Sequence, residues 1–279
     1  MDFGRAEVWL PQVITGLVLL MKFTLGFNTR LSYLTYFKDK WQLLLGSVFV
    51  AVLLPPVIGL ILVNLFQPGV LVSSTLLLLA AAPGAPLSAF KVFRFDGSYS
   101  FGISLQILLI VLSVFTLPLT LEIYNRYFQL GITAHWLDLS RQIATVVVLP
   151  MLIGFLLGRL MPDWVEKYGI VAGNVVNRIM VAFMIPMLWL FRESFLSLTA
   201  MDYIMFLMFV TILYGTGHCL GGSSKKHRIS LAIVSASRHL GICLFLAVQS
   251  YGQMALLQVL VPYAIVNIML GIVYNRLVR

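Results

Sequence analysis

Apolar stretches of about 20 residues recur along the whole chain, and short connections hold most of the charged residues. A helix of that length spans the hydrocarbon core of a bilayer. The pattern therefore predicts an all-α membrane protein with nine transmembrane helices. The predicted spans cover residues 9–27, 42–66, 70–94, 98–124, 140–160, 172–191, 202–220, 229–249 and 254–275.

The composition adds that no soluble domain is present. Of the 279 residues, 60% are hydrophobic and 10% are charged, and the mean hydropathy is +0.98. A soluble domain carries about 25% charged residues. We therefore expect one membrane domain over residues 1–279. The two cysteines, Cys219 and Cys243, lie in apolar stretches, and their spacing fits neither a disulfide framework nor a metal site.

The lysines and arginines give the predicted spans an orientation. Twelve of the 19 lie in loops on one side of the membrane and four on the other. The twelve are Arg30, Lys38, Lys40, Lys91, Arg94, Arg159, Lys167, Lys225, Lys226, Arg228, Arg276 and Arg279, and the four are Arg5, Arg126, Arg141 and Arg192. Cytoplasmic loops carry the excess, so we expect the N-terminus outside and the C-terminus in the cytoplasm. These loops also explain the net charge of +9, and no nucleic-acid partner is expected.

The third predicted span contains the motif Pro-Gly-Ala-Pro at residues 83–86. The two prolines remove backbone donors, and the glycine between them loosens a helix further. We predict a true break at mid-depth, with a simple proline kink as the alternative. Pro86 suits the first position of a new half-helix, with Ser88 in its first turn. The N-terminal end of such a half-helix attracts anions.

The eighth predicted span carries the stretch "SASRHLG" near its midpoint. Small residues such as Ser237 and Gly241 let two helix backbones cross closely. Arg238 and His239 lie beside them, at a depth where an arginine costs roughly 2.5–3.5 kcal/mol on insertion scales. The two interrupted spans are five apart in order, which fits an inverted repeat of spans 1–4 and 6–9. Inverted repeats with broken helices are typical of transporters.

At these two segments the chain resembles the bile acid:sodium symporter family, and the resemblance covers nearly the whole length. Family members carry Pro-Gly-Gly-x-x-Ser-Asn in one crossing helix, where residues 83–89 read PGAPLSA. The partner crossing helix of the family carries Glu-x-x-x-Gln-Asn-Ser-Gly, where residues 234–241 read VSASRHLG.

The resemblance implies two domains, with substrate bound in the crevice between them beside the helix crossing. The core domain would comprise residues 42–124 and 202–275, and the panel domain would comprise residues 9–27 and 140–191. Bacterial relatives commonly have ten helices, and this chain resembles one that lacks the first, in agreement with an N-terminus outside. The resemblance thus implies an integral protein of the bacterial inner membrane.

The chain departs from the family at the residues that bind sodium. Val234 and Ala89 stand where the family has a sodium-binding glutamate and asparagine, and Arg238 replaces a glutamine that serves a sodium site. All ten acidic residues fall in loops or near span ends, so the usual compensating carboxylate is missing from the membrane interior. We therefore expect the sodium site to be lost, with no cofactor and no metal.

Arg238 is the centre of the functional hypothesis. It would replace the bound cation as a fixed charge that stabilises an anionic substrate; a structural tie between the broken helices is the alternative. His239 would contact substrate, move a proton or fill a polar contact at the crossing. The predicted substrate-binding residues are Arg238, His239, Ser88, Ala85, Gln106 and Ser237, and the predicted helix-break residues are Pro83, Gly84, Pro86 and Gly241.

Three further residues are singled out by position. Gln106 gains from the resemblance, because relatives place a sodium-site hydroxyl there. Lys22 either snorkels to the cytoplasmic interface or stays at depth, and Arg178 is expected at the interface.

Together these features predict a secondary transporter that moves a small organic anion, a carboxylate, by alternating access and without sodium. A non-transporting sensor or scaffold, a sodium-coupled symporter with neutral ligands and, less favoured, a channel are the alternatives. No nucleophile–base set occurs in the sequence, so an enzyme is not expected. The "GFLLG" stretch at residues 154–158 has a spacing used in helix dimers and in internal packing alike, so a monomer and a homodimer both stay open.

Overall fold

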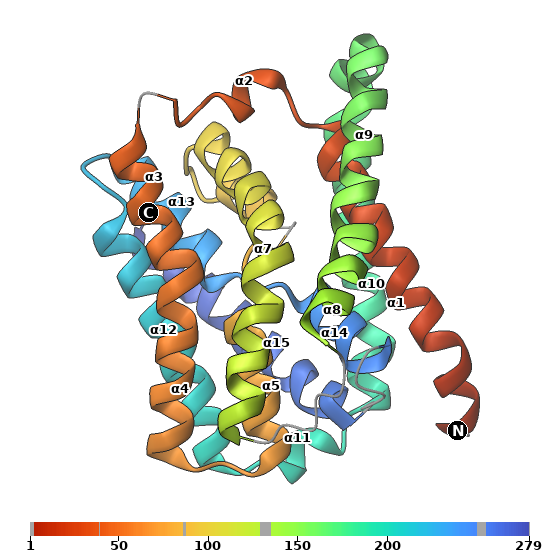
Figure 1. Cartoon of the computed structure of the whole chain (residues 1–279), viewed down its shortest axis with the longest axis vertical. Helices are drawn as coiled ribbons and strands as arrows, with labels where there is room; N and C mark the ends of the chain where they lie inside the picture. The colour runs from red at the N-terminus through yellow and green to blue at the C-terminus, as the bar shows by residue number, and fades with distance from the viewer. Residues whose placement is uncertain (1–2, 39, 86–87, 129–134, 250–254, 279) are drawn as a thin grey trace.

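A computed structural model describes residues 3–38, 40–85, 88–128, 135–249 and 255–278, and Figure 1 shows the course of the chain. These residues form helices and no strand. The helices are α1 (Phe3–Phe27), α2 (Leu31–Leu34), α3 (Trp41–Val48), α4 (Leu54–Phe66), α5 (Val70–Ala81), α6 (Ser88–Arg94), α7 (Tyr99–Phe128), α8 (Trp136–Ile143), α9 (Leu149–Leu160), α10 (Pro162–Leu190), α11 (Ser194–Ser197), α12 (Ala200–Leu220), α13 (Lys225–Ala236), α14 (Leu240–Gln249) and α15 (Ala255–Val278), with π-helical turns η1 (Phe49–Leu53) and η2 (Ala144–Val148).

Eight helical segments in the described part of the chain are long and apolar enough to cross a membrane. They are Leu10–Phe27, Trp41–Phe66, Tyr99–Phe128, Trp136–Leu160, Val171–Leu190, Ala200–Leu220, Lys225–Ala247 and Ala255–Val278. Each lies over one of the nine predicted spans. The remaining predicted span, residues 70–94, holds two shorter helices, α5 and α6. The helical membrane protein is therefore confirmed, but the described residues give eight long segments and not nine.

Two of these segments contain a π-helical turn directly before proline. Pro55 and Pro56 follow η1, and Pro150 follows η2. Proline has no N–H, and its ring clashes with the carbonyl four residues earlier. The wider π-helical turn relieves this clash, so both segments continue as helices to Phe66 and Leu160.

The helices pack as two groups with α14 between them. α1, α9 and α10 pack on one another on one side of the molecule, and α4, α5, α7, α12, α13 and α15 pack together on the other (Figure 1). α14 contacts α1 from the first group and α5 and α15 from the second. In the most apolar stretch of Lys225–Ala247, 94% of the residues are buried, whereas in that of Val171–Leu190 the share is 20%. The α13–α14 segment therefore lies at the centre, and α10 lies at the outside.

Glycines let α1 and α9 approach closely. A Cβ atom placed on Gly26 would lie 1.9 Å from the backbone oxygen of Met151, and one on Gly154 would lie 2.1 Å from that of Phe23. Gly158 meets α1 in the same way. The "GFLLG" stretch thus packs within the chain, as small residues do between membrane helices, and it gives no support for a homodimer.

Replacing Gly154 by leucine should separate α1 from α9, because the new side chain has no space between the two backbones. Overpacking of this kind costs about 1–3 kcal/mol of the free energy of unfolding, or more. The measurement is the thermal unfolding midpoint of the purified protein in detergent. Gly16→Leu is the matched control, because a Cβ atom on Gly16 meets nothing within 4 Å. Equal midpoints for the two variants would contradict this packing.

Candidate functional site

Two non-helical stretches, residues 82–85 after α5 and residues 237–239 between α13 and α14, lie against each other, and we call this place the helix crossing. α5 ends at Ala81 and α13 ends at Ala236, and neither stretch that follows is helical. Two backbone hydrogen bonds join these stretches. The Ala85 N–H donates to the Ser237 carbonyl at 3.3 Å, and the His239 N–H donates to the Ala82 carbonyl at 3.2 Å. Each non-helical stretch thus provides a hydrogen-bond partner for a backbone group of the other.

The predicted Pro-Gly-Ala-Pro motif lies in the first of these stretches. Pro83 and Gly84 follow the end of α5, and Pro86 lies outside the described residues. Gly84 has a φ of +77°, which favours glycine. A Cβ atom there would also lie 3.0 Å from the Cβ of Leu109 and 3.2 Å from the Nε2 of Gln106. Gly84 is therefore required both for the turn and for close packing against α7.

The guanidinium of Arg238 donates to four backbone carbonyls. Its Nε donates to Leu79 at 3.0 Å, its Nη2 to Ala80 at 2.6 Å, and its Nη1 to Ala51 at 3.0 Å and to Ser235 at 3.3 Å. The side chain is 2% exposed. These bonds tie α5, η1 and α13 together, as the structural alternative expected, and the contact of Arg238 with substrate stays a prediction.

The local sequence explains why these carbonyls are available. Leu79 and Ala80 lie in the last turn of α5, where carbonyls lack a donor four residues on. The Ala51 carbonyl would accept the N–H of residue 55 in an α-helix and that of residue 56 in a π-helix. Both residues are prolines, which have no N–H, so this carbonyl lacks a helical donor. The positive charge of Arg238 also lies at the C-terminal end of α5, where the helix dipole is negative.

Ser88 and Gln106 bond to each other across α6 and α7. The Ser88 Oγ donates to the Gln106 Oε1 at 2.7 Å, and the Gln106 Nε2 donates to the Gly84 carbonyl. Both side chains are 0% exposed. The structure therefore brings these two predicted residues together, and the bonds that it shows hold the first interrupted helix in shape.

Asn267 does for the second interrupted helix what Gln106 does for the first, and it is absent from the predicted set. Its Nδ2 donates to the Ala236 carbonyl at 2.8 Å, at the end of α13. The sequence carries a signal for this role: Asn267 lies in the apolar helix that follows α13 and α14, as Gln106 lies in the apolar helix that follows α5 and α6. Buried amides between membrane helices form such bonds.

His239 and Ser237 keep buried polar atoms that have no partner among the described residues. The His239 Nδ1 accepts the Ile242 N–H at 3.1 Å and so caps α14, while its Nε2 is buried and unpaired. The Ser237 Oγ is likewise buried and unpaired. The third predicted residue nearby, Gly241, lies against α1, since a Cβ atom on it would be 3.2 Å from the Cγ2 of Val18.

Lys22 lies on α1 and is 0% exposed. The expectation that it snorkels to the interface is therefore wrong, because other helices cover it. Its Nζ has no hydrogen-bond partner in the part of the chain that the structure describes. Nothing in the sequence of α1 gives the direction of this side chain, which the helices packed around α1 bury.

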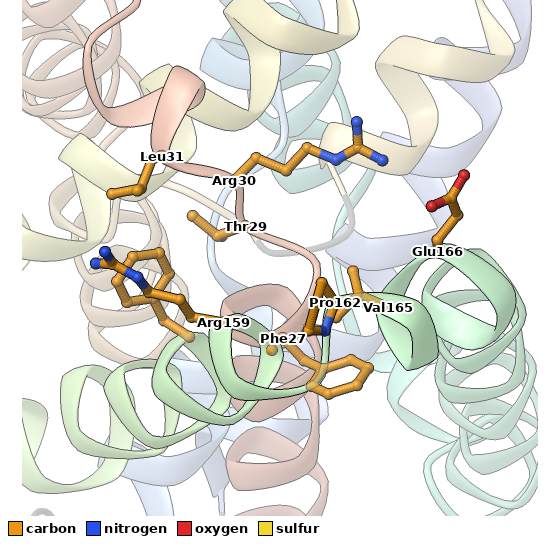
Figure 2. A pocket seen from close by; sticks show the side chains of 10 residues that line it. Phe27, Thr29, Arg30, Leu31, Arg159, Pro162, Val165 and Glu166 are labelled. Atoms are coloured by element: carbon orange, nitrogen blue, oxygen red, sulfur yellow. The ribbon is translucent and has the colours of Figure 1, made fainter.

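A separate pocket of about 380 Å³ opens where α1 and α9 end and α10 begins (Figure 2). Arg30, Arg159 and Glu166 are among its lining residues, and the two guanidinium groups point away from each other. None of the predicted substrate-binding residues lines it. Among the described residues, no three His, Cys, Asp or Glu side chains come together as metal ligands.

The comparison with known proteins agrees with this architecture. The chain matches the Sodium Bile acid symporter family over residues 15–214, well over half of its 279 residues, and it belongs to that family. It is an integral membrane protein of the bile acid symporter type, a class of membrane transporters. No curated protein matches the chain. The matched range contains α5 and α6 and ends in α12, before Arg238.

Replacing Gln106 by leucine should destabilise the protein, because the Gly84 carbonyl and the Ser88 hydroxyl would lose their buried partner. Each unsatisfied group costs about 1–3 kcal/mol of the free energy of unfolding. The thermal unfolding midpoint in detergent reports this loss. Gln258→Leu, at an exposed position on α15, should leave the midpoint unchanged. Equal midpoints for Gln106→Leu and the control would show that the Gln106 amide does not stabilise the non-helical stretch after α5.

Proposed function

We propose that the chain is a secondary transporter that carries a small organic anion, a carboxylate, by alternating access and without sodium. The observation that carries the proposal is the Arg238 guanidinium, which holds a fixed charge inside the membrane domain on backbone carbonyls. Family membership supplies the transporter class. The chemistry of the helix crossing supports the choice of substrate and the independence from sodium.

The first support is that side-chain N–H groups already donate hydrogen bonds to the carbonyls that would coordinate a cation. In transporters with discontinuous helices, unwound backbone carbonyls and helix C-terminal ends coordinate sodium. Here the carbonyls at the end of α5 accept from Arg238, and the Gly84 carbonyl in the first break accepts from Gln106. A guanidinium that never leaves can replace the electrostatic effect of a mobile ion.

The second support is the loss of side-chain oxygens. Val234 and Ala89 stand at the positions of the sodium-binding glutamate and asparagine in the resemblance described above. They are 0% and 1% exposed, so both positions are filled by apolar packing. Without these oxygens a sodium ion would lack the negative charge that compensates it in the membrane interior.

The third support is an excess of positive charge in the interior. Arg238 and Lys22 are both buried. The ion pairs in the described part of the chain are Glu122–Arg126, Asp138–Arg141 and Glu193–Arg192, and none involves either residue. An interior whose cations have no carboxylate partner among the described residues favours an anionic ligand, and a carboxylate forms strong charge-assisted hydrogen bonds with cationic donors.

The architecture suits alternating access. In the proposed arrangement, α5 and α6 together form the ninth crossing, interrupted as α13–α14 is, and the two halves of the chain form an inverted repeat. The core would contain residues 42–124 and 202–275 and the panel residues 9–27 and 140–191. Movement of one group past the other would expose the crossing to each side in turn.

A non-transporting sensor or scaffold is the second candidate. The observation in its favour is that Arg238, Ser88 and Gln106 all bond within the crossing. Uptake measurements distinguish the two functions, because a scaffold moves no solute.

Purified protein in liposomes should take up labelled short carboxylates at the same initial rate in sodium buffer and in choline buffer. The reason is that the fixed charge of Arg238 makes a mobile cation unnecessary. Empty liposomes give the background. Uptake that occurs only in sodium would contradict the proposal, and the absence of uptake for every carboxylate tested would favour the scaffold.

Arg238→Gln should reduce carboxylate uptake by about 100-fold or more, because glutamine brings no positive charge to the crossing and a loss of about 2.8 kcal/mol of anion stabilisation is a factor of 100. A variant that restores the three family residues, with Ala89→Asn, Val234→Glu and Arg238→Gln together, should regain uptake only in sodium. The initial rates with and without sodium are the measurement. Normal uptake by Arg238→Gln in choline buffer would show that the guanidinium is dispensable.

A further inference from the structure

We propose that Lys22 and His239 together bind the carboxylate of the substrate, in the interface between α1 and α14. The inference rests on the proposed function, since it names the groups that would hold the anion. It assigns the contact to a panel helix and to the first turn of α14. It leaves Arg238 as the charge that holds the crossing together.

The first observation is the isolation of the Lys22 ammonium group. The side chain is 0% exposed, and the Nζ has no hydrogen-bond partner within the described ranges. None of the ion pairs found there includes it. A buried ammonium with neither a counter-charge nor hydrogen bonds is far more costly than one that is paired and hydrogen-bonded.

The second observation is the tautomer of His239. Its Nδ1 accepts a hydrogen bond from the Ile242 N–H at 3.1 Å, so in the neutral ring the proton is on Nε2. Nε2 is therefore a donor, and it is buried without an acceptor among the residues that the structure describes. The Ser237 Oγ, two residues earlier, is also buried and unpaired there.

The third observation is that Lys22 and His239 share one interface. α1 packs on α14, and Val18, one turn before Lys22 on the same face of α1, meets Gly241. A Cβ atom on Gly241 would lie 3.2 Å from Val18 Cγ2 and 3.6 Å from His239 Cε1. Lys22 is thus on the side of α1 that packs on α14, and His239 lies at the N-terminal end of α14.

Among the described residues, the Lys22 Nζ and the His239 Nε2 are hydrogen-bond donors without acceptors. An ammonium group has three N–H donors, and the His239 ring adds one, while a carboxylate has two oxygens with about four acceptor sites. A carboxylate would satisfy both side chains and compensate the charge of Lys22, which a water molecule would not do. The N-terminal end of α14 adds the positive end of a helix dipole.

The position of Lys22 adds a mechanical consequence. Lys22 belongs to the group formed by α1, α9 and α10, and His239 lies at the crossing, so the bound carboxylate would bridge the two groups. The bridge exists only while α1 lies against α14. Movement of the groups past each other would then be coupled to the making and breaking of this site.

The test uses the purified full chain in detergent, with the choline salts of pyruvate, succinate and benzoate as probes and choline chloride at the same ionic strength as reference. At least one carboxylate should raise the unfolding midpoint of the wild type. Lys22→Met should abolish this shift and raise the KM for uptake of that carboxylate by about 100-fold. In choline chloride alone, Lys22→Met should unfold at a midpoint no lower than the wild type, because it removes an uncompensated buried charge.

Two further variants make the result specific. Lys38→Met removes an exposed lysine and should leave both the shift and the KM unchanged. His239→Asn keeps an acceptor for the Ile242 N–H, because asparagine caps helices well, but it removes the donor at Nε2. His239→Asn should raise the KM about tenfold, as expected for the loss of about 1.4 kcal/mol. This variant tests carboxylate binding at the site even if Lys22→Met fails to fold.

The outcomes separate this inference from the proposed function. If Lys22→Met and His239→Asn keep the wild-type carboxylate shift and KM, the inference is overturned and the transport proposal stands. If the wild type takes up none of the three carboxylates and none raises its midpoint, the proposed function and the inference both fail. A lost shift with an unchanged Lys38→Met control supports the site.

Discussion

The structure depends on one guanidinium group that satisfies carbonyls in the middle of the membrane domain. The Pro55–Pro56 pair leaves the Ala51 carbonyl without a helical donor, and α5 ends before Pro83, so that its last carbonyls lack the helical donor four residues on, although the Leu79 carbonyl also accepts the Ala82 N–H at 3.2 Å. In the hydrocarbon core no water can take the missing role, so each such oxygen costs several kcal/mol if it stays unpaired. Arg238 comes from a third segment and bonds both places. Arg238 thus gives these carbonyls a hydrogen-bond donor, and the carbonyls stabilise the charge of Arg238.

The helices themselves could be predicted because hydropathy is a local property of the sequence. The prediction of residues 42–66 and the segment Trp41–Phe66 differ by one residue, and α5 and α13 end where Pro, Gly and small residues gather. The partners of the polar side chains could not be predicted. Arg238 bonds a carbonyl 159 residues away, and the pair Pro55–Pro56, which reads as a kink, proves to be the reason that one acceptor is free.

The direction of a buried side chain is the other property that sequence leaves open. Lys22 lies in an apolar helix with glycines and small residues on several faces, and it could have reached the interface with its flexible stem. The helices packed around α1 prevent this. For the same reason Ser88 and Gln106 could be assigned to the crossing, but their mutual hydrogen bond follows only from the geometry of α6 and α7.

Two buried cations therefore have different surroundings. Arg238 is neutralised by oriented backbone dipoles, which are fixed parts of the fold. Lys22 has no such compensation among the described residues. In the further inference, Arg238 holds the helix crossing together and Lys22 binds the carboxylate of the substrate.

The glycine contact between α1 and α9 determines where the molecule can shear. Gly26, Gly154 and Gly158 bring the two backbones so near that each helix fits into the groove of the other, and sliding would force atoms into one another. On its other side α1 meets α14 through the side chain of Val18 at Gly241. In the proposed transport cycle, α1 and α9 would therefore move together as one rigid unit relative to α14.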